Sequence, residues 1–202
     1  MSARTGFLGP AAPSPGADRL AAADEATHGY VMNLTRLWAH SPEAKERLFE
    51  AMEAVAVSGA LTMRQRGILV TATAREIGDS YCSLAWGGRL AQAADEATAT
   101  AVLSGDDAGL NEQDRALAQW ARKVASSPGR TTEQDVQELR DAGLTDAEVF
   151  AATAFVALRQ AFSVINGALG AQPDAELVAR LPEAVVRAVD WGRPPTVADP
   201  VT

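Results

Sequence analysis

The stretch DAEVFAATAFVALRQAFSVINGAL, residues 146–169, carries the longest helical pattern in the chain and decides its fold class. Apolar side chains recur in it at offsets of three and four residues, the spacing of one face of an α-helix. The residues of this face are Phe155, Leu158, Phe162, Ile165 and Leu169. Arg159 and Gln160 interrupt the pattern, and they either line an internal pocket or mark one wet edge. Because other apolar residues fall on the remaining sides, we predict that this helix is the central one. Thr145, directly before it, is the predicted N-cap.

The rest of the chain carries the start and stop signals of further helices. The predicted N-caps are Ser41, Thr62, Asp79 or Ser80, Asn111 and Thr132. Gly59, Gly78 and Gly143 mark helix ends. No segment alternates convincingly between apolar and polar residues, so the sequence predicts no strands. We expect an all-α bundle of about eight helices with short connections.

Both ends of the chain are rich in proline and glycine. Residues 1–17 are predicted to form an irregular N-terminal arm, and residues 191–202 an irregular C-terminal tail. Between them, residues 18–190 are expected to form a single all-α domain.

The composition argues against several classes of protein. A net charge of −8 disfavours binding to nucleic acid or to an anionic membrane surface, because both need clustered basic side chains. The single cysteine cannot form an internal disulfide, and neither a secretory signal nor an apolar run of ~20 residues is visible. We therefore predict a cytoplasmic protein. His28 and His40 lack metal-ligand spacing and no cofactor motif appears, so we expect no metal and no cofactor.

The segment REIGDSYCSLAW, residues 75–86, contains the only cysteine, Cys82. If Asp79 is the N-cap, Cys82 is the third helical residue, where free backbone N–H groups favour a thiolate. The negative charge of Asp79 opposes this effect. The spacing places Asp79, Cys82, Trp86 and Arg89 on one helical face. Residue type alone favours a small buried hydrophobe, so the pattern indicates a candidate centre and leaves a reactive and a structural thiol both open.

Several motifs, taken in order, point to a family. The sequence reads GYVMNL at residues 29–34, LTMRQR at 61–66 and Tyr81-Cys82, and later LRDAGL at 139–144 and ALG at 168–170. In this order and spacing they resemble the carboxymuconolactone decarboxylase and alkylhydroperoxidase D-like superfamily, in particular its peroxidase-related members. The resemblance covers residues 29–177 and implies an alkylhydroperoxidase D-like helical bundle.

The resemblance also implies a site. The peroxidase branch carries a Cys-x-x-Cys at a helix start, a His four residues later, and a Glu on the preceding helix. Position by position, Cys82 matches the attacking cysteine, Asp79 the resolving cysteine, Trp86 the His and Gly67 the Glu. Tyr81 and Glu76 complete the pocket expected on this basis. Three of the four functional positions are therefore changed.

These changes set the functional hypotheses. Without a partner thiol, Cys82 would be oxidised to a sulfenic acid and reduced by an external thiol, which predicts a slow one-cysteine thiol peroxidase. The alternative is a non-catalytic helical oligomer that binds a small apolar or acidic ligand in the family cavity. A lactone decarboxylase-like enzyme is the third reading. The resemblance implies a dimer, trimer or hexamer, and alanine-rich helices, which bury little area each, agree with a homo-oligomer.

Overall fold

The computed structural model describes residues 6–196, and in these residues the chain is helical without strands. Eight helices have nine residues or more, which confirms the prediction of an all-α bundle of about eight helices. They are α1 (Pro15–His28), α3 (Pro42–Ser58), α4 (Met63–Glu76), α5 (Ser80–Ala93), α6 (Glu96–Ser104), α7 (Glu112–Ser126), α8 (Glu133–Asp141) and α9 (Asp146–Ala168). Three shorter helices are α2 (Asn33–Trp38), α10 (Ala175–Val178) and α11 (Glu183–Arg187).

The predicted helix starts are largely formed by local capping. Thr62, Thr132 and Thr145 each accept a hydrogen bond from the backbone three residues on, in capping boxes completed by a Gln, Asp or Glu side chain. Asp79 and Asn111 cap α5 and α7 in the same way with their side chains. Ser41 precedes α3 but makes no side-chain cap. Helix α6, capped by Asp95, was not predicted.

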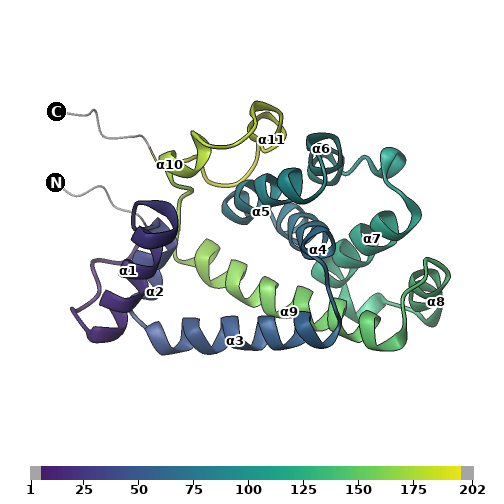
Figure 1. The fold of residues 1–202 in the computed structure, drawn as a ribbon, viewed down its shortest axis with the longest axis horizontal. Coiled ribbons are helices and arrows are strands. Elements are labelled where there is room, and N and C mark those ends of the chain that lie inside the picture. Colours follow the sequence, from purple (N-terminus) through teal and green to yellow (C-terminus); the bar gives the residue numbers. More distant parts are fainter. Residues whose placement is uncertain (1–5, 197–202) are drawn as a thin grey trace.

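The central helix is α4, not α9. Every residue of α4 from 67 to 74 is buried, and the helix packs against α5, α6, α7 and α9. Figure 1 shows α9 running beside α3 along one side of the molecule, with α4, α5, α6 and α7 on the other side. The prediction that α9 is central was therefore wrong. Its apolar residues on several sides do not all enter the core.

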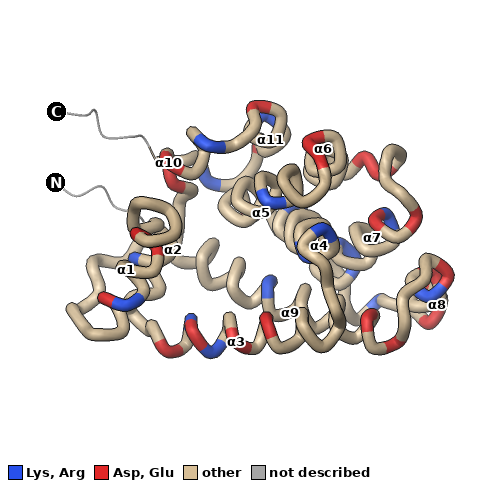
Figure 2. The backbone as a smooth tube through the Cα atoms, viewed as in Figure 1, with Lys and Arg blue, Asp and Glu red and all other residues tan. Residues whose placement is uncertain are grey.

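The buried face of α9 differs from the predicted one. Phe155 and Phe162 are buried as expected, but Ile165 is exposed. In the second half of the helix the core instead takes three polar residues, Arg159, Ser163 and Asn166. Figure 2 shows that charged positions are few on α9, and in the sequence Arg159 is its one basic residue. We call Arg159, Ser163 and Asn166 the polar seam.

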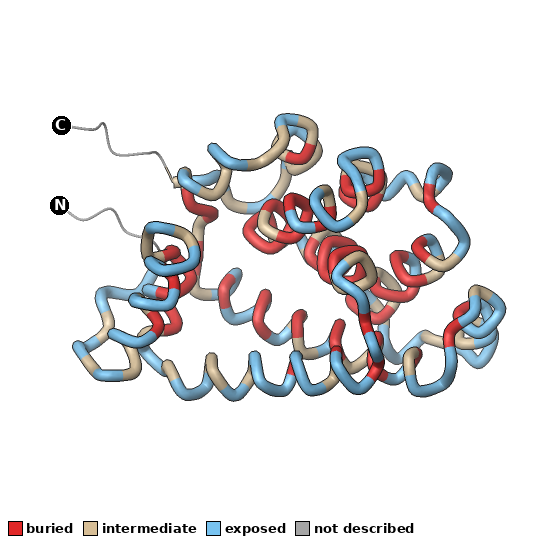
Figure 3. Tube along the Cα trace, viewed as in Figure 1, coloured by how far each residue is buried: buried red, intermediate tan, exposed pale blue. Residues whose placement is uncertain are grey.

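Helix α9 is also the one helix of residues 6–196 that is long and apolar enough to cross a membrane, by length and composition alone. In this fold one of its faces packs against α3, α4 and α7, as the buried turns in Figure 3 illustrate. The buried polar seam lies on that face. These contacts are those of a core helix in a globular bundle.

The described parts of the predicted arm and tail, residues 6–17 and 191–196, contain more regular structure and more contacts than the composition indicates. Helix α1 begins at Pro15, three residues before the predicted domain start, because Ser14 caps it and proline occupies its first position. Trp191, in the predicted tail, packs against the core, and the Ser80 hydroxyl donates to the carbonyl of Arg193 at 2.7 Å. The predicted arm and tail also include residues 1–5 and 197–202, which lie outside the described residues.

Candidate active site around Cys82

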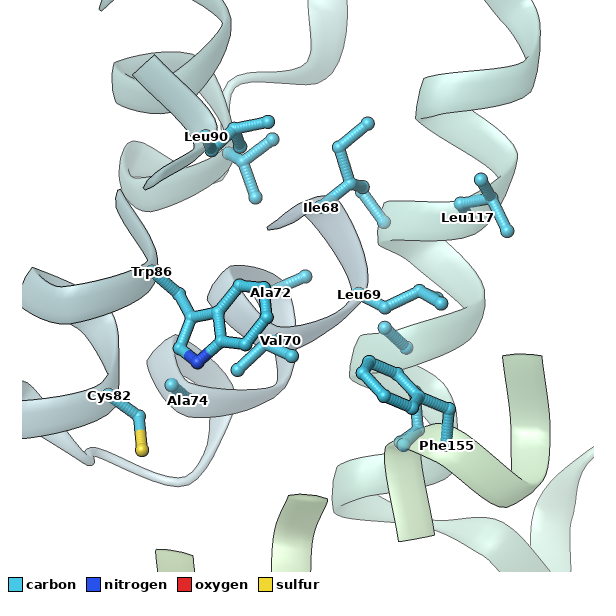
Figure 4. Packing of buried hydrophobic residues seen from close by; sticks show 14 of the residues in the cluster. Ile68, Leu69, Val70, Ala72, Ala74, Cys82, Trp86, Leu90, Leu117 and Phe155 are labelled. Carbon is cyan, nitrogen blue, oxygen red and sulfur yellow. The ribbon is translucent and has the colours of Figure 1, made fainter. Parts of the chain in front are cut away.

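Cys82 lies in the first turn of α5, as the sequence predicted. Asp79 is the N-cap, and its Oδ1 accepts a hydrogen bond of 3.0 Å from the Cys82 backbone N–H. The side chain is buried, with 2% of the residue exposed. Figure 4 shows Cys82 and Trp86 on the same helix, close to α4. The helix start is therefore formed as expected, while the thiol is shielded from solvent.

The partner of the thiol is Arg159, which comes from the polar seam of α9. Its Nη2 lies 3.6 Å from Cys82 Sγ, and its Nη1 lies 3.7 Å from Met52 Sδ. The guanidinium also lies over two aromatic rings, 5.1 Å from the centroid of Trp86 and 5.2 Å from that of Phe162. From the sequence, Arg159 interrupts an apolar stripe and was expected either to line an internal pocket or to mark a wet edge; the structure buries it, with 5% of the residue exposed. That interruption was the available signal, since a charge on a buried helix face needs a reason.

A second arginine approaches the same ring. The guanidinium of Arg89 lies 4.8 Å from the Trp86 centroid, in agreement with the predicted face of α5. Partial desolvation and the neighbouring charge of Arg159 lower the pKa of Arg89. Trp86, at the position that the sequence resemblance assigns to a histidine, therefore serves as a packing surface for two cations.

Burial decides the protonation state of the thiol. Desolvation, reinforced by the charge of Asp79, raises the pKa of Cys82 to about 12. Arg159, and after it the Ser163 hydroxyl, act in the opposite direction and only partly offset this rise. At neutral pH Cys82 is consequently a neutral thiol beside the Arg159 guanidinium.

The other predicted pocket residues are not all brought to Cys82. Asp79 and Trp86 are. The side chain of Glu76 is exposed, and a Cβ on Gly67 would contact Leu90, eight residues beyond Cys82 on α5. Leu90 is roughly 12 Å from Cys82 along the axis of α5, so Gly67 of α4 packs against a part of α5 well away from the thiol. Gly67 thus provides close packing of α4 against α5.

Tyr81 has a separate role from its neighbour. Its hydroxyl donates to the buried carboxylate of Asp174, which also accepts the backbone N–H of Asn33 at 2.7 Å. Burial raises the pKa of Asp174, and burial together with the charge of Asp174 raises the pKa of Tyr81. This network connects the start of α5 to α2 and to the segment before α10, and so fixes the position of the first turn.

Two surface hollows lie elsewhere. One of about 460 Å³ lies between α7 and α8 and is lined by polar residues including Arg115, Lys123 and Glu138. Another lies between α6 and α11. Cys82 lines neither of them. Within residues 6–196 no group of three His, Cys, Asp or Glu side chains is arranged to hold a metal ion.

Comparison with known proteins rests on structure. No protein-family model matches the sequence, and no curated protein matches it. A solved structure of an uncharacterized peroxidase-related protein from Ralstonia eutropha JMP134, with the alkylhydroperoxidase AhpD core, superposes with a TM-score of 0.77. The two share 23% identity over 89% of this chain and 98% of the other. The chain has the AhpD fold.

Two further structures agree with the AhpD fold. A peroxidase-related protein from Silicibacter sp. TM1040 matches with a TM-score of 0.72 and 18% identity, over 86% of this chain and 94% of the other. The debrominase Bmp8, as a cysteine-to-alanine variant in complex with 2,3,4-tribromopyrrole, matches with a TM-score of 0.70 and 14% identity. That alignment covers 93% of this chain and 98% of Bmp8. The predicted resemblance is thereby confirmed at the level of fold.

The variant Asp79→Asn tests whether the charge of Asp79 controls the pKa of Cys82. Asparagine keeps the N-cap, but loss of the negative charge should lower the pKa of Cys82 and accelerate its alkylation at pH 7 about three- to tenfold. Asp95→Asn, the same change at the N-cap of α6, is the matched control. Equal alkylation rates in Asp79→Asn and the unmodified protein, measured by mass spectrometry, would show that Asp79 does not control the thiol.

Proposed function

We propose that the chain is a slow one-cysteine thiol peroxidase in which Cys82 attacks the peroxide. The observation that carries the proposal is the buried guanidinium of Arg159, 3.6 Å from Cys82 Sγ. A cation at this distance stabilises the negative charge that a sulfur nucleophile must carry. The peroxidase-related names of two proteins with the same fold support the proposal.

The proposed reaction cycle needs one cysteine, one peroxide and two molecules of an external thiol. The Cys82 thiolate attacks one peroxide oxygen, the O–O bond breaks, and the alkoxide leaves with the bonding electrons and takes a proton from water. The sulfur is oxidised to a sulfenic acid, and the peroxide is reduced to an alcohol and the transferred hydroxyl. A first external thiol then releases water and forms a mixed disulfide, and a second one restores Cys82 and leaves as a disulfide.

The residues around Cys82 also explain why the reaction should be slow. Trp86 and Gly67 stand where the resemblance places a His and a Glu, so neither of these bases is present. The carboxylate beside the thiol, Asp79, raises the pKa of Cys82 and so disfavours the thiolate. The chain has no second cysteine to resolve the sulfenic acid. Reduction by an external thiol requires a reducing compartment, which agrees with the predicted cytoplasmic location.

Peroxide treatment tests the proposal directly. Cys82 should form a sulfenic acid that dimedone traps, and over-oxidised forms should accumulate as the peroxide concentration rises. Mass spectrometry of the intact protein measures both products, and Cys82→Ser is the control that should remain unmodified. A Cys82 that stays reduced in millimolar peroxide, in protein that circular dichroism shows to be folded, would contradict the enzymatic function.

One observation favours the second candidate, a ligand-binding protein without catalysis. The thiol is buried and its pKa is raised, as expected for a structural cysteine. This candidate predicts saturable binding of a small ligand with no turnover. If the sulfenic acid does not form, ligand binding without catalysis replaces the peroxidase as the proposed function.

We also propose that the chain assembles into a homo-oligomer through the outer surface of α3 and α9. Large apolar side chains are exposed along both helices: Phe49, Val57, Phe150, Val164 and Ile165. α3 and α9 pack side by side, so these side chains lie on neighbouring helices, and a symmetric partner would cover them. The occupant proposed is a second copy of this chain.

Sedimentation at micromolar concentration should therefore give a mass that is a multiple of 21.1 kDa. Phe150→Glu should shift the protein toward monomer, because it places a charge in the buried interface. Ala97→Glu, on α6 at the opposite side of the molecule in Figure 1, adds the same charge and should leave the mass unchanged. A monomer at all concentrations would rule out this assembly.

A further inference from the structure

The hydrogen-bond donors of Arg159 are almost all unused. A guanidinium offers five N–H donors that match the geometry of an oxyanion. Here Nη1 and Nη2 approach only the sulfurs of Met52 and Cys82, at 3.7 and 3.6 Å, and sulfur is a weak acceptor. The buried Nε has no hydrogen-bond partner. Within residues 6–196, no oxygen atom accepts a hydrogen bond from this side chain.

Arg159 also has no ion-pair partner among the described residues. The residue is 5% exposed, yet it forms no ion pair in the described part of the chain. The carboxylate of Asp79 acts on the same thiol from the start of α5, but it makes no contact with the guanidinium within salt-bridge distance. The second charge near Trp86 is another cation, Arg89. A buried cation without a counter-charge is strongly unfavourable unless something supplies one.

The polar seam reverses the arrangement that would be most stable, in which apolar side chains of α9 are buried and polar ones are exposed. Val164 and Ile165 are exposed on α9 while Ser163 and Asn166 are buried beside them in sequence. The Asn166 side chain accepts from the indole N–H of Trp38 at 2.8 Å, but its own Nδ2 donor has no partner. Two buried donors on one helical face, two turns apart, thus lack acceptors. Such groups in a folded protein indicate an absent ligand, ion or water.

We propose that Arg159 binds a small planar monoanion, a carboxylate or an inorganic oxyanion of similar size, beside the Cys82 sulfur. Two oxygens of such an anion fit the in-plane edge of the guanidinium that Nε and Nη2 form. The aromatic rings of Trp86 and Phe162, 5.1 and 5.2 Å from the guanidinium carbon, offer it no oxygen acceptor, so these N–H donors remain available to an anion. The inference does not depend on peroxide chemistry. An anion at Arg159 and a thiolate at Cys82 would compete for the same positive charge.

Binding can be measured in Cys82→Ser protein, where no thiol chemistry occurs. At constant ionic strength, acetate and nitrate should each raise the Tm by about 3 °C at ten times their Kd, whereas acetamide should not. Arg159→Gln should abolish the shift. Arg159→Lys, which keeps the charge but not the two-pronged geometry, should weaken binding and covers the case in which the glutamine variant fails to fold. Arg47→Gln, an exposed arginine of α3, is the control and should bind normally.

The unmodified protein provides an independent readout. Acetate should slow the alkylation of Cys82 several-fold, because an anion beside the sulfur disfavours the thiolate, and acetamide should have no effect. If only acetate produces these effects, the site accepts carboxylates alone; if nitrate does as well, it accepts planar oxyanions generally. Equal effects of acetate and acetamide, or an unchanged response in the Arg159 variants, would overturn the proposal. The dimedone experiment is unaffected by either result.

Discussion

At pH 10 the Cys82 thiol should react with iodoacetamide about a thousandfold faster than at pH 7, since the thiolate fraction rises about tenfold per pH unit below the pKa. The physical basis is the burial that raises the pKa of Cys82 to about 12. A free thiol with a pKa near 8.5 gains only about thirtyfold over the same interval and then reaches a plateau. The absence of a plateau below pH 10 is therefore the distinguishing result.

The measurement needs folded protein across the whole range. A neutral thiol with a raised pKa contributes stability that is fully present below the unfolded value of about 8.5 and is lost as pH rises toward about 12. Circular dichroism at each pH checks that the fold survives, and glutathione alkylated in parallel corrects for the reagent. A plateau near pH 9 would mean that Cys82 is an ordinary accessible thiol in solution.

Arg159→Met should have opposite effects on stability and on reactivity. Methionine fills similar space without a buried charge, so unfolding should become less favourable by about 1–3 kcal/mol. Loss of the cation should raise the pKa of Cys82 further and slow its alkylation by about tenfold or more at pH 7. A residue that lowers stability while raising reactivity is what a functional site is expected to contain.

Urea unfolding and alkylation of the same preparation measure the two effects. Arg47→Met, on the surface of α3, should change neither the stability nor the alkylation rate appreciably. The opposite outcome, a protein destabilised by several kcal/mol with an unchanged alkylation rate, would make Arg159 a structural residue. It would also remove the main support for chemistry at Cys82.

The parts of the structure that depend on neighbouring residues could be predicted from the sequence. Asp79 caps α5 and Thr145 caps α9 because a capping side chain reaches only three residues along the chain. For the same reason Cys82 could be placed in a first helical turn. Gly87 and Gly88, two glycines in the interior of α5, allow close packing, since a Cβ at either would meet Leu103, Val185 or Leu181.

The orientation of α9 and the environment of the thiol could not be predicted in this way. The apolar pattern of α9 has more than one apolar side, and periodicity alone does not say which side meets α4. The contact between Arg159 and Cys82 joins residues 77 positions apart, with no local signal to link them. The family pattern also misplaced Gly67, since a position on α4 acquires its neighbours only when α4 and α5 pack.

The hydrogen bond from Tyr81 to Asp174 bears on the order in which the protein folds. It spans 93 residues, and the bond between Asn33 and Asp174 spans 141, so the first turn of α5 acquires these anchors only when almost the whole chain is present. Contacts of such sequence separation tend to form late in folding. During synthesis Cys82 is therefore an exposed thiol with the ordinary acidity of an unfolded chain. In newly made or partly unfolded molecules the thiol should therefore react as an ordinary cysteine, and it should come under the influence of Arg159 and Asp79 only when the fold is complete.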